Sequence, residues 1–356
     1  MTPRILYIAN ARFPSARAHG IQLQSMVEAF ARAGVSVELF VPHLPRANAA
    51  PIRGVSVRRV WTTPWRASRI GFLLSSLIFG ILSVLTVLPR RGILYSIDLD
   101  YFSFFLIPFL GRPYFFEIHS AKRPTLPHRL LFSRATGVIA VNESVRRALE
   151  ESFPRLRGRT MVFPNGVDLA RYEVPPRAGL MRPAAVYTGS FQDWKGVDTV
   201  LAGAAALPAV SFYLVGGAAS ELPAASPPNV SVIPPVAFSE VPAWQKAADV
   251  LLLTGTAADE YSYRYTSPMK LREYMAAGRP VVAAQTPAIT QEVSDEEAFF
   301  YEPDNAESLV RAVREALENP EEGARRAEKL RARAGDYTWE RRAARILGFI
   351  AAHRAP

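Results

Sequence analysis

Short apolar runs alternate with longer amphipathic stretches along this chain. Ile5–Ala9 has the length and composition of a strand, and Gln22–Ala33 has helical periodicity and ends at Gly34, a common residue just after a helix. Further strands are expected at Val35–Val41, Val55–Val60, Ile93–Ser96, Tyr114–Ile118, Gly137–Val141 and Met161–Phe163. Strands that alternate with helices in this way predict an α/β protein with a parallel, doubly wound sheet.

The same alternation begins again at Ala184–Thr188, after a stretch at residues 165–183 that is rich in Pro, Arg and Gly. Strands are then expected at Ser211–Val215, Val230–Ile233, Val250–Leu253, Val281–Ala284 and Ala298–Tyr301. A chain of 356 residues is long for one domain. The sequence therefore predicts two Rossmann-like domains, residues 1–170 and 171–338. A C-terminal helix at 339–356 is expected to cross back to the first domain.

The chain contains no cysteine, which excludes disulfides, zinc–thiolate sites, iron–sulfur clusters and cysteine nucleophiles. Its histidines show no metal-ligand spacing to one another, so no metal site is expected. They are His19, His43, His119, His128 and His353. The N-terminus lacks the charged and long apolar regions of a signal peptide, and a cytoplasmic location is expected.

Positive charge is concentrated in the first half of the chain. Residues 1–170 hold 22 Lys and Arg against 9 Asp and Glu, whereas residues 171–356 hold 20 against 23. Basic surfaces attract nucleic acids, anionic lipids and phosphorylated substrates alike. No helix-turn-helix or RNP-type pattern supports nucleic acid, so no nucleic-acid partner is expected. Solvated arginine explains part of the charge but not the difference between the halves.

Ile70–Leu88 carries no charged residue and is flanked by arginines that include Arg69 and Arg90. Its length satisfies the rule for a transmembrane helix, but it contains Ser, Thr and Gly and lies between strands of one sheet. Three interpretations stay open: a helix packed on the sheet, a helix docked in a membrane interface, and a true span. The nearby Trp61 and Trp65 fit interfacial docking.

Two candidate ligand contacts lie in the first half. Gly20 precedes a helix expected to start near Gln22, so it would let backbone approach an anion at the helix N-terminus. An ordinary tight turn explains it equally well. His119 follows the expected strand Tyr114–Ile118, and ligands collect at the carboxyl ends of such strands. It could hydrogen-bond a sugar hydroxyl or a phosphate, or serve as a structural cap of the next loop.

In the second half, the first expected strand leads into the segment YTGSFQDWKG, Tyr187–Gly196. Gly189 and Ser190 follow the strand, where a glycine permits close approach of backbone to a ligand. Lys195 would supply positive charge to a diphosphate. The alternative is a solvent-facing lysine beside a turn.

The segment TSPMKLREYMAAG, residues 266–278, predicts a helix that starts sharply, with Ser267 as its N-cap and Pro268 as its first helical residue. The free amides of its first turn would then hold a phosphate. Glu273, two turns into the helix, could accept hydrogen bonds from both hydroxyls of a ribose. A glutamate on a helix is more often a plain surface residue.

Taken in order, the motifs are HG, EIH, PNGVD, YTGSFxxWKG, SPMKLREYMAAGRPVV and PAITQE. The series resembles the retaining glycosyltransferase family 4, of the GT-B fold, over nearly the whole chain. Each motif is modest, whereas their joint occurrence is specific. The resemblance implies two Rossmann-like doubly wound domains that face a central cleft. It also implies a nucleoside diphosphate sugar as donor substrate, with no metal and no cofactor.

The resemblance implies a role for each candidate residue. His119 would approach the donor sugar, Lys195 would bind the diphosphate, and Glu273 would bind the ribose; these three are the expected catalytic residues. Other donor-binding residues are expected in the same motifs and are Gly20, Gly189, Ser190, Arg264, Ser267, Pro268 and Lys270. Asn165, in PNGVD, would lie at the hinge between the domains.

Two positions depart from the family pattern. Tyr265 stands where the E-x7-E motif of the family places its first glutamate, and Ser190 stands where an arginine commonly follows the glycine. Arg264 or Lys270 would then supply the missing positive charge. Relatives with an SPxKLxEYMAxG helix share this pattern, which indicates divergence and not loss of activity.

The leading hypothesis is a retaining, metal-independent, hexosyltransferase-like enzyme that acts in cell-surface polysaccharide or glycolipid synthesis. Its acceptor, a glycan, a lipid-linked sugar or another molecule, would bind the basic first domain. An anionic membrane is a further expected partner, with the protein peripheral on its inner face. Two alternatives stay open. One is a sugar-nucleotide epimerase, which needs acid and base carboxylates and has only Glu117 as a candidate. The other is a non-catalytic partner that binds nucleotide or membrane.

Overall fold

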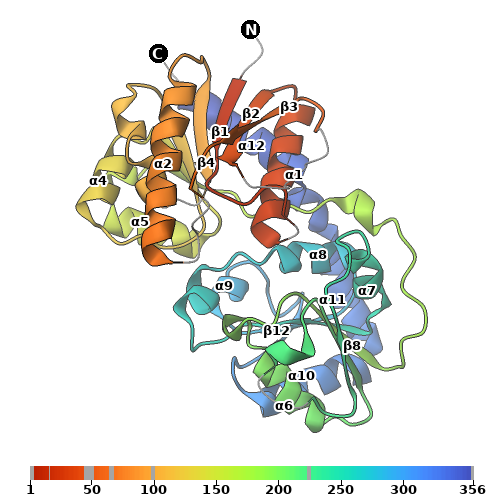
Figure 1. Ribbon diagram of the computed structural model, residues 1–356. Helices are drawn as coiled ribbons and strands as arrows, with labels where there is room; N and C mark the ends of the chain where they lie inside the picture. The colour runs from red at the N-terminus through yellow and green to blue at the C-terminus, as the bar shows by residue number, and fades with distance from the viewer. Residues whose placement is uncertain are drawn as a thin grey trace. The chain divides into compact units, whose positions relative to one another are not determined.

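The computed structural model describes residues 4–15, 17–43, 52–63, 68–97, 101–222 and 226–353. Its internal contacts divide the chain into two compact units (Figure 1). The first unit comprises Met1–Pro164 and Trp339–Pro356, and the second comprises Asn165–Thr338. The boundary therefore follows Pro164, a few residues before the predicted boundary at 170. Val167 explains the difference, because it is buried in the core of the second unit and pairs with Thr338 there.

The first unit contains a parallel sheet of seven strands in the order β3-β2-β1-β4-β5-β6-β7. The strands are β1 Arg4–Ile8, β2 Ser36–Pro42, β3 Val55–Val60, β4 Ile93–Ile97, β5 Tyr114–Ile118, β6 Gly137–Ala140 and β7 Thr160–Val162. Every residue of the central strands β4 and β5 is buried. Burial on both faces is typical of parallel sheets, and it explains why these strands read as continuous apolar runs.

The helices of the first unit follow the strands in turn. They are α1 Ala18–Arg32, α2 Arg69–Val87, α3 Tyr101–Phe104, η1 Ile107–Phe109, α4 Leu126–Ser133, α5 Glu143–Ser152, η2 Pro154–Leu156 and α12 Trp339–Ala352. The crossover through α1 runs toward one edge of the sheet and the crossover through α2 toward the other. Since such crossovers are right-handed, α1 and α2 cover opposite faces. α12 packs on α1, and its Phe349 makes edge-to-face contacts with Phe115 and Phe163.

The second unit repeats this architecture with six parallel strands in the order β10-β9-β8-β11-β12-β13. The strands are β8 Ala184–Thr188, β9 Ser211–Val215, β10 Val230–Ile233, β11 Val250–Leu253, β12 Val281–Ala284 and β13 Phe299–Tyr301. The helices are η3 Leu169–Tyr172, η4 Asp193–Lys195, α6 Val197–Ala205, η5 Ala219–Glu221, α7 Val241–Ala247, η6 Tyr261–Tyr265, α8 Met269–Ala277, α9 Pro287–Thr290, α10 Ala306–Glu318, α11 Pro320–Ala332 and η7 Ala334–Tyr337. The predicted doubly wound α/β fold is therefore confirmed in both halves.

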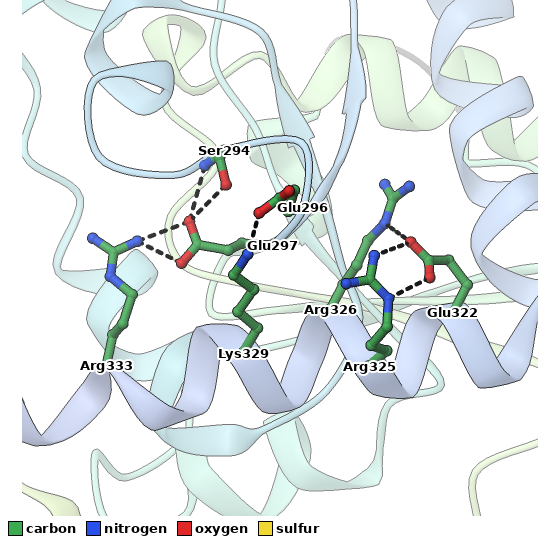
Figure 2. Close-up of polar contacts among 8 residues, drawn as sticks. All are labelled: Ser294, Glu296, Glu297, Glu322, Arg325, Arg326, Lys329 and Arg333. Carbon is green, nitrogen blue, oxygen red and sulfur yellow. Dashed lines mark hydrogen bonds and ion pairs between the residues drawn. The ribbon is translucent and has the colours of Figure 1, made fainter.

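Ion pairs attach α11 to the loop that precedes β13 (Figure 2). Glu297 is buried in this loop and accepts two hydrogen bonds from Arg333, at 2.7 and 2.8 Å, as well as bonds from the backbone and hydroxyl of Ser294. Its neighbour Glu296 is exposed and pairs with Lys329. The buried pair closes the C-terminal end of α11 onto the sheet, whereas the exposed pair adds little.

α2 is the predicted apolar segment, and it is packed into the first unit as one of its helical layers (Figure 1, drawn in orange). In the described part of the chain, it is the one helix whose length and composition suit a membrane span. Its residues Ser75, Ser76, Phe79 and Ser83 are buried against the rest of the unit. Of the two tryptophans named with it, Trp61 is exposed, and Trp65 lies outside the described residues.

Candidate functional site

The strand order of the second unit reverses between β8 and β11, and polar side chains collect beyond the carboxyl ends of these two strands. Ligands in open α/β sheets bind at such switch points. β8 leads into Gly189 and, through η4, to Lys195, while the chain after β11 reaches Lys270 and Glu273 on α8. The topology thus brings the two separate sequence motifs of the second half to one edge of one sheet.

Two lysines occupy this edge close to each other. Lys270 places its Nζ 3.5 Å from the centre of the Tyr187 ring, and Lys195 places its Nζ 3.5 Å from that of Trp194. Burial lowers the pKa of Lys195 to about 8. Burial and the charge of Lys195 together hold the pKa of Lys270 well below its usual range. Two ammonium groups in one apolar, aromatic setting make a strong site for an anion, because an anion would relieve both desolvation and mutual repulsion.

Gly189 leaves the space that Lys270 uses. Its φ of 140° lies in the region that favours glycine, and a Cβ there would stand 3.1 Å from the Nζ of Lys270. The amide of Gly189 donates to the carbonyl of Val215 at 2.7 Å, which fixes the turn after β8. Ser190 follows as an exposed residue whose carbonyl accepts from the hydroxyl of Tyr187. The absent side chain at position 189 therefore allows the lysine to lie directly over the turn.

Glu273 is held by a chain of hydrogen bonds that begins in the core. The Nε2 of Gln245 donates to Oε2 of Glu273 at 3.0 Å and to the hydroxyl of Thr188 at 2.9 Å. Its Oε1 accepts from the buried hydroxyl of Tyr172 at 2.6 Å. Burial raises the pKa of Glu273, while the hydrogen bond from Gln245 and the charges of Arg171 and Lys270 oppose the rise. Gln245 thus positions the Glu273 carboxylate through Oε2, and Oε1 of Glu273 is available to hydroxyl donors.

The start of α8 differs from the prediction by one residue. The helix begins at Met269 with Pro268 as its N-cap, so Ser267 is not the N-cap and Pro268 is not the first helical residue. Pro268 has an extended ψ of 117°, and its carbonyl accepts the first helical bond from Leu271. Asn165 anchors the turn by donating to the carbonyl of Ser267 at 3.2 Å. Because a proline cap offers no side-chain acceptor, the first-turn amides other than that of Leu271 remain for a ligand.

The predicted residue Arg264 and the departing residue Tyr265 both lie in η6, before the start of α8. Arg264 is exposed and stacks on the neighbouring Tyr263, with its guanidinium 5.6 Å from the ring centre. Tyr265, at the position of the missing glutamate, has its hydroxyl 3.5 Å from Glu260. Lys270 interacts electrostatically with Lys195, whereas Arg264 is exposed.

The first unit contains a second polar cluster, at the carboxyl end of β5. Glu117 is fully buried there and accepts two hydrogen bonds from Arg342 of α12, at 2.7 and 3.2 Å, and one from the hydroxyl of Tyr95 at 2.8 Å. Burial opposes the ionisation of Glu117, but the charge of Arg342 and the contact with His119 hold its pKa at about 2. The carboxylate is therefore ionised throughout the physiological range.

His119 stands next to this carboxylate. Its Nε2 lies 2.8 Å from Oε1 of Glu117, which also accepts from Gln22 at 2.7 Å. An ionised carboxylate favours the tautomer with the proton on Nε2. The Nδ1 of His119 is then the ring nitrogen that is not bonded to Glu117. The side chain is mostly buried, and Glu117 and Gln22, whose Nε2 lies 3.0 Å from Nε2 of His119, together set the direction of the ring.

The prediction that Gly20 lies in the turn before a helix is wrong. Gly20 lies in the first turn of α1, which begins at Ala18, and its amide donates to the carbonyl of Arg17. A Cβ at position 20 would stand 2.5 Å from both the Cβ and the carbonyl oxygen of Ser15. Close packing of the preceding loop on the helix therefore requires this glycine, whether or not a ligand is bound.

Three residues that hold the two carboxylates carried no sequence signal. Arg342 lies far along the chain from Glu117, and Gln22 and Gln245 stand in helices where a buried glutamine looks like any surface one. Only the tertiary fold brings each of them to its carboxylate. Within the described ranges, no group of three or more His, Asp and Glu side chains is placed to hold a metal ion.

Two family models match the chain, one in each half. The family of Glycosyl transferases group 1 matches residues 182–319, and the Glycosyl transferase 4-like domain matches residues 18–166. A search of curated proteins gave no sequence match.

Solved structures of low sequence identity share the fold. Sucrose-phosphate synthase from Thermosynechococcus elongatus has a TM-score of 0.81 at 18% identity, over 98% of each chain. Anabaena HepE in complex with UDP-glucose has a TM-score of 0.74 at 16% identity, over 98% of this chain and 99% of HepE. WaaG, a glycosyltransferase involved in lipopolysaccharide biosynthesis, has a TM-score of 0.70 at 16% identity, over 96% of this chain and 99% of WaaG.

Proposed function

This chain belongs to the group 1, family 4-like glycosyltransferases of the GT-B fold, and from that premise we propose how it holds its donor. The enzyme transfers a sugar from a nucleotide sugar. Lys195 and Lys270 bind the diphosphate, together with the first-turn amides of α8, and Glu273 binds the ribose. The observation that carries this assignment is the pair of half-buried lysines, Lys195 at the end of η4 and Lys270 in the first turn of α8, each with a lowered pKa.

The chemistry of these groups suits a leaving diphosphate. Negative charge develops on the diphosphate as the bond to the sugar breaks, and preorganised cations and helix amides stabilise that charge more than they stabilise the ground state. Lys195 and Lys270 carry this role without a metal ion. We propose that the sugar is transferred with retention, with the leaving diphosphate taking the acceptor's proton, since neither cluster contains a second carboxylate near the first.

We propose His119 as the sugar-binding residue of the first unit. With Nε2 directed at Glu117, its Nδ1 can accept a hydrogen bond from a sugar hydroxyl. Glu117 itself does not act as an acid or base, because Arg342 holds it ionised and it has no exposed surface. The same fact weakens the epimerase alternative, which needs a carboxylate that exchanges protons with the sugar.

The charge of the first unit is the basis on which we propose a class of acceptor. The first unit carries the excess of positive charge, which suits a phosphorylated or lipid-linked acceptor in cell-surface polysaccharide or glycolipid synthesis. We propose that the transferred sugar is a hexose.

Incubation of the full chain with a panel of nucleotide sugars, without acceptor, tests the function. A glycosyltransferase releases nucleoside diphosphate slowly by transfer to water, and the replacement Lys270→Met should abolish this release. Interconversion of the sugar without release of diphosphate would favour the epimerase. Binding of nucleotide with neither reaction, for every sugar in the panel, would favour the non-catalytic partner.

A further inference from the structure

The helix α2 directs small and polar side chains toward the protein, whereas a surface helix of a water-soluble domain directs its apolar side chains there. Its small and polar residues face the protein, among them Ser76 and Gly80. Asn10 donates hydrogen bonds to the hydroxyls of Ser76 at 3.0 Å and Ser103 at 2.7 Å. A Cβ at Gly80 would stand 2.6 Å from the carbonyl oxygen of Ser103. The small residues are therefore required for the close contact between α2 and α3.

Several of the large apolar residues of α2 face outward, whereas Phe79 and Val87 are buried. Ile70 is 72% exposed, Leu74 52%, Leu85 59% and Leu88 58%. Together with the exposed Ile81, they recur at helical spacing and so form one stripe along the helix. A surface helix in water normally carries polar residues on this face. We call this stripe, Ile70, Leu74, Ile81, Leu85 and Leu88, the α2 stripe.

The apolar surface continues onto the neighbouring elements. α3 packs beside α2 and exposes Phe102, α4 packs on α3 and exposes Leu126 at its first turn, and η1 beside α4 exposes Phe109. The guanidinium of Arg134 lies 5.5 Å from the centre of the Phe109 ring. Exposed large apolar side chains on four neighbouring elements, with charged groups beside them, indicate a site of interaction with a membrane or with another protein.

The charge of the chain segment that contains the stripe favours the membrane. Residues 39–142 contain 13 Lys and Arg against 3 Asp and Glu, and Glu38, just before this segment, pairs with Arg58 and Arg90. Of the three acids, Glu117 is fully buried and paired, and Asp98 and Asp100 lie outside the described residues. The arginines that flank α2 on either side, Arg69 and Arg91, are exposed. A second copy of this chain would bring the same positive charge against itself, so the charge disfavours a symmetric dimer through this face.

We propose that the α2 stripe docks the first unit onto an anionic lipid bilayer. The stripe enters the boundary between headgroups and acyl chains, and the flanking arginines bind lipid phosphates. α2 does not cross the bilayer, because its other face is bonded into the unit and its ends are fixed. Ser68 caps the amide of Gly71 at 3.0 Å, and Arg112 donates to the carbonyl of Val87 at 3.1 Å. This inference is independent of the donor site.

Flotation with lipid vesicles tests the proposal on the full chain. Vesicles of phosphatidylcholine alone are compared with vesicles that also contain phosphatidylglycerol, at low and high salt. The protein should float with the anionic vesicles at low salt and much less with the neutral ones. The double variant Leu74→Gln, Leu85→Gln should lower the bound fraction at least about tenfold, and Arg69→Gln with Arg91→Gln should remove the dependence on anionic lipid.

The control replaces an equally exposed apolar residue elsewhere. Met181→Gln changes a side chain of the second unit that is also largely exposed, and it should leave flotation unchanged. All variants alter surface residues, so each should keep the thermal unfolding midpoint and the nucleoside diphosphate affinity of the parent protein. Those two measurements separate a failure of docking from a failure of folding or of the donor site.

Four outcomes would overturn the proposal. The first is a parent protein that does not float with anionic vesicles, and the second is a double variant that floats as well as the parent. The third is membrane-bound protein that only detergent releases, which would mean that α2 spans the bilayer. The fourth is a dimer of the parent protein that the Leu74→Gln, Leu85→Gln variant dissociates, which would make the stripe a contact between copies.

Discussion

Arg342 of α12 donates two hydrogen bonds to Glu117 at the end of β5. One, of 2.7 Å, joins Nη2 to Oε1, and the other, of 3.2 Å, joins Nη1 to Oε2. The Nε of Arg342 also donates to the carbonyl of Pro164 at 2.8 Å. The last helix of the chain is thereby fastened to the end of the first unit's sheet, beside His119. Both partners are fully or almost fully buried, so the pair has no water to replace a lost partner.

Glu117→Gln should destabilise the protein by about 3–5 kcal/mol, because it leaves the buried charge of Arg342 without its partner. Glu143→Gln is the matched control. It removes a carboxylate that pairs with Arg146 on the surface of α5, and it should change stability by less than about 1 kcal/mol. Urea unfolding at neutral pH measures both. Equal small effects of the two variants would mean that the Arg342 contact is not formed.

The same carboxylate predicts how stability depends on acid. The pKa of Glu117 is lowered from 4.5 to about 2 on folding, so its contribution to stability is complete above pH 4.5 and is lost as the pH falls toward 2. The acid-induced loss of stability should therefore be shallower in Glu117→Gln than in the parent protein over this range. Unfolding midpoints recorded between these pH values check the prediction.

The neighbouring residues Glu296 and Glu297 allow the effect of an exposed carboxylate to be compared with that of a buried one (Figure 2). Glu297→Gln should cost about 1–3 kcal/mol, because the buried carboxylate holds Arg333 and the Ser294 turn. Glu296→Gln, one position away, should cause no measurable change, because Glu296 and its partner Lys329 are exposed. Thermal unfolding of the two variants gives the comparison, and a larger effect at Glu296 would contradict it.

Gly189→Ala should weaken both stability and diphosphate binding. The backbone there has a φ of 140°, which strains any residue with a Cβ by about 1–3 kcal/mol, and the Cβ would displace the Lys270 ammonium. Gly335→Ala is the control, since a Cβ at that position meets no atom within 4 Å. Calorimetric titration with a nucleoside diphosphate should show weaker binding for the first variant alone.

Diphosphate binding should weaken as the pH rises through about 8. Lys195 has a pKa lowered to about 8 in the free protein, so it is charged below that pH and neutral above it. The affinity should fall by roughly tenfold for each pH unit above this value, and binding near it should take up protons. Calorimetry in two buffers of different ionisation enthalpy measures that uptake. Lys195→Met should make the dependence shallower and leave the part that comes from Lys270, whereas Lys329→Met, at an exposed lysine, should not change it.

The sequence predicted the strands and most helices well, because strands buried on both faces of a parallel sheet read as apolar runs bounded by turns. Lys195 and Glu273 were found as candidates because each stands in a local motif at the carboxyl edge of a sheet. Lys270 entered only as a substitute for the charge missing at Ser190. The structure brings it beside Lys195, which local spacing could not specify.

The remaining differences have physical causes that a single sequence does not display. The start of α8 shifted because Pro268 kept an extended ψ, and Gly20 is required by the loop at Ser15. The partners Arg342 and Gln245 come from distant segments. The orientation of α2 was not predictable either, because an apolar stretch with small residues defines two faces without saying which one meets the protein.

The most direct test of the proposed donor site compares pyrophosphate with a nucleoside diphosphate as ligands of the full chain, by calorimetric titration. Lys195→Met should weaken both ligands by about 10- to 100-fold, since both present the diphosphate. Glu273→Gln should weaken the nucleoside diphosphate by about tenfold or more and leave pyrophosphate unchanged, since only the nucleotide carries a ribose. Equal weakening of both ligands by Glu273→Gln, or no effect of either variant, would contradict the assignment.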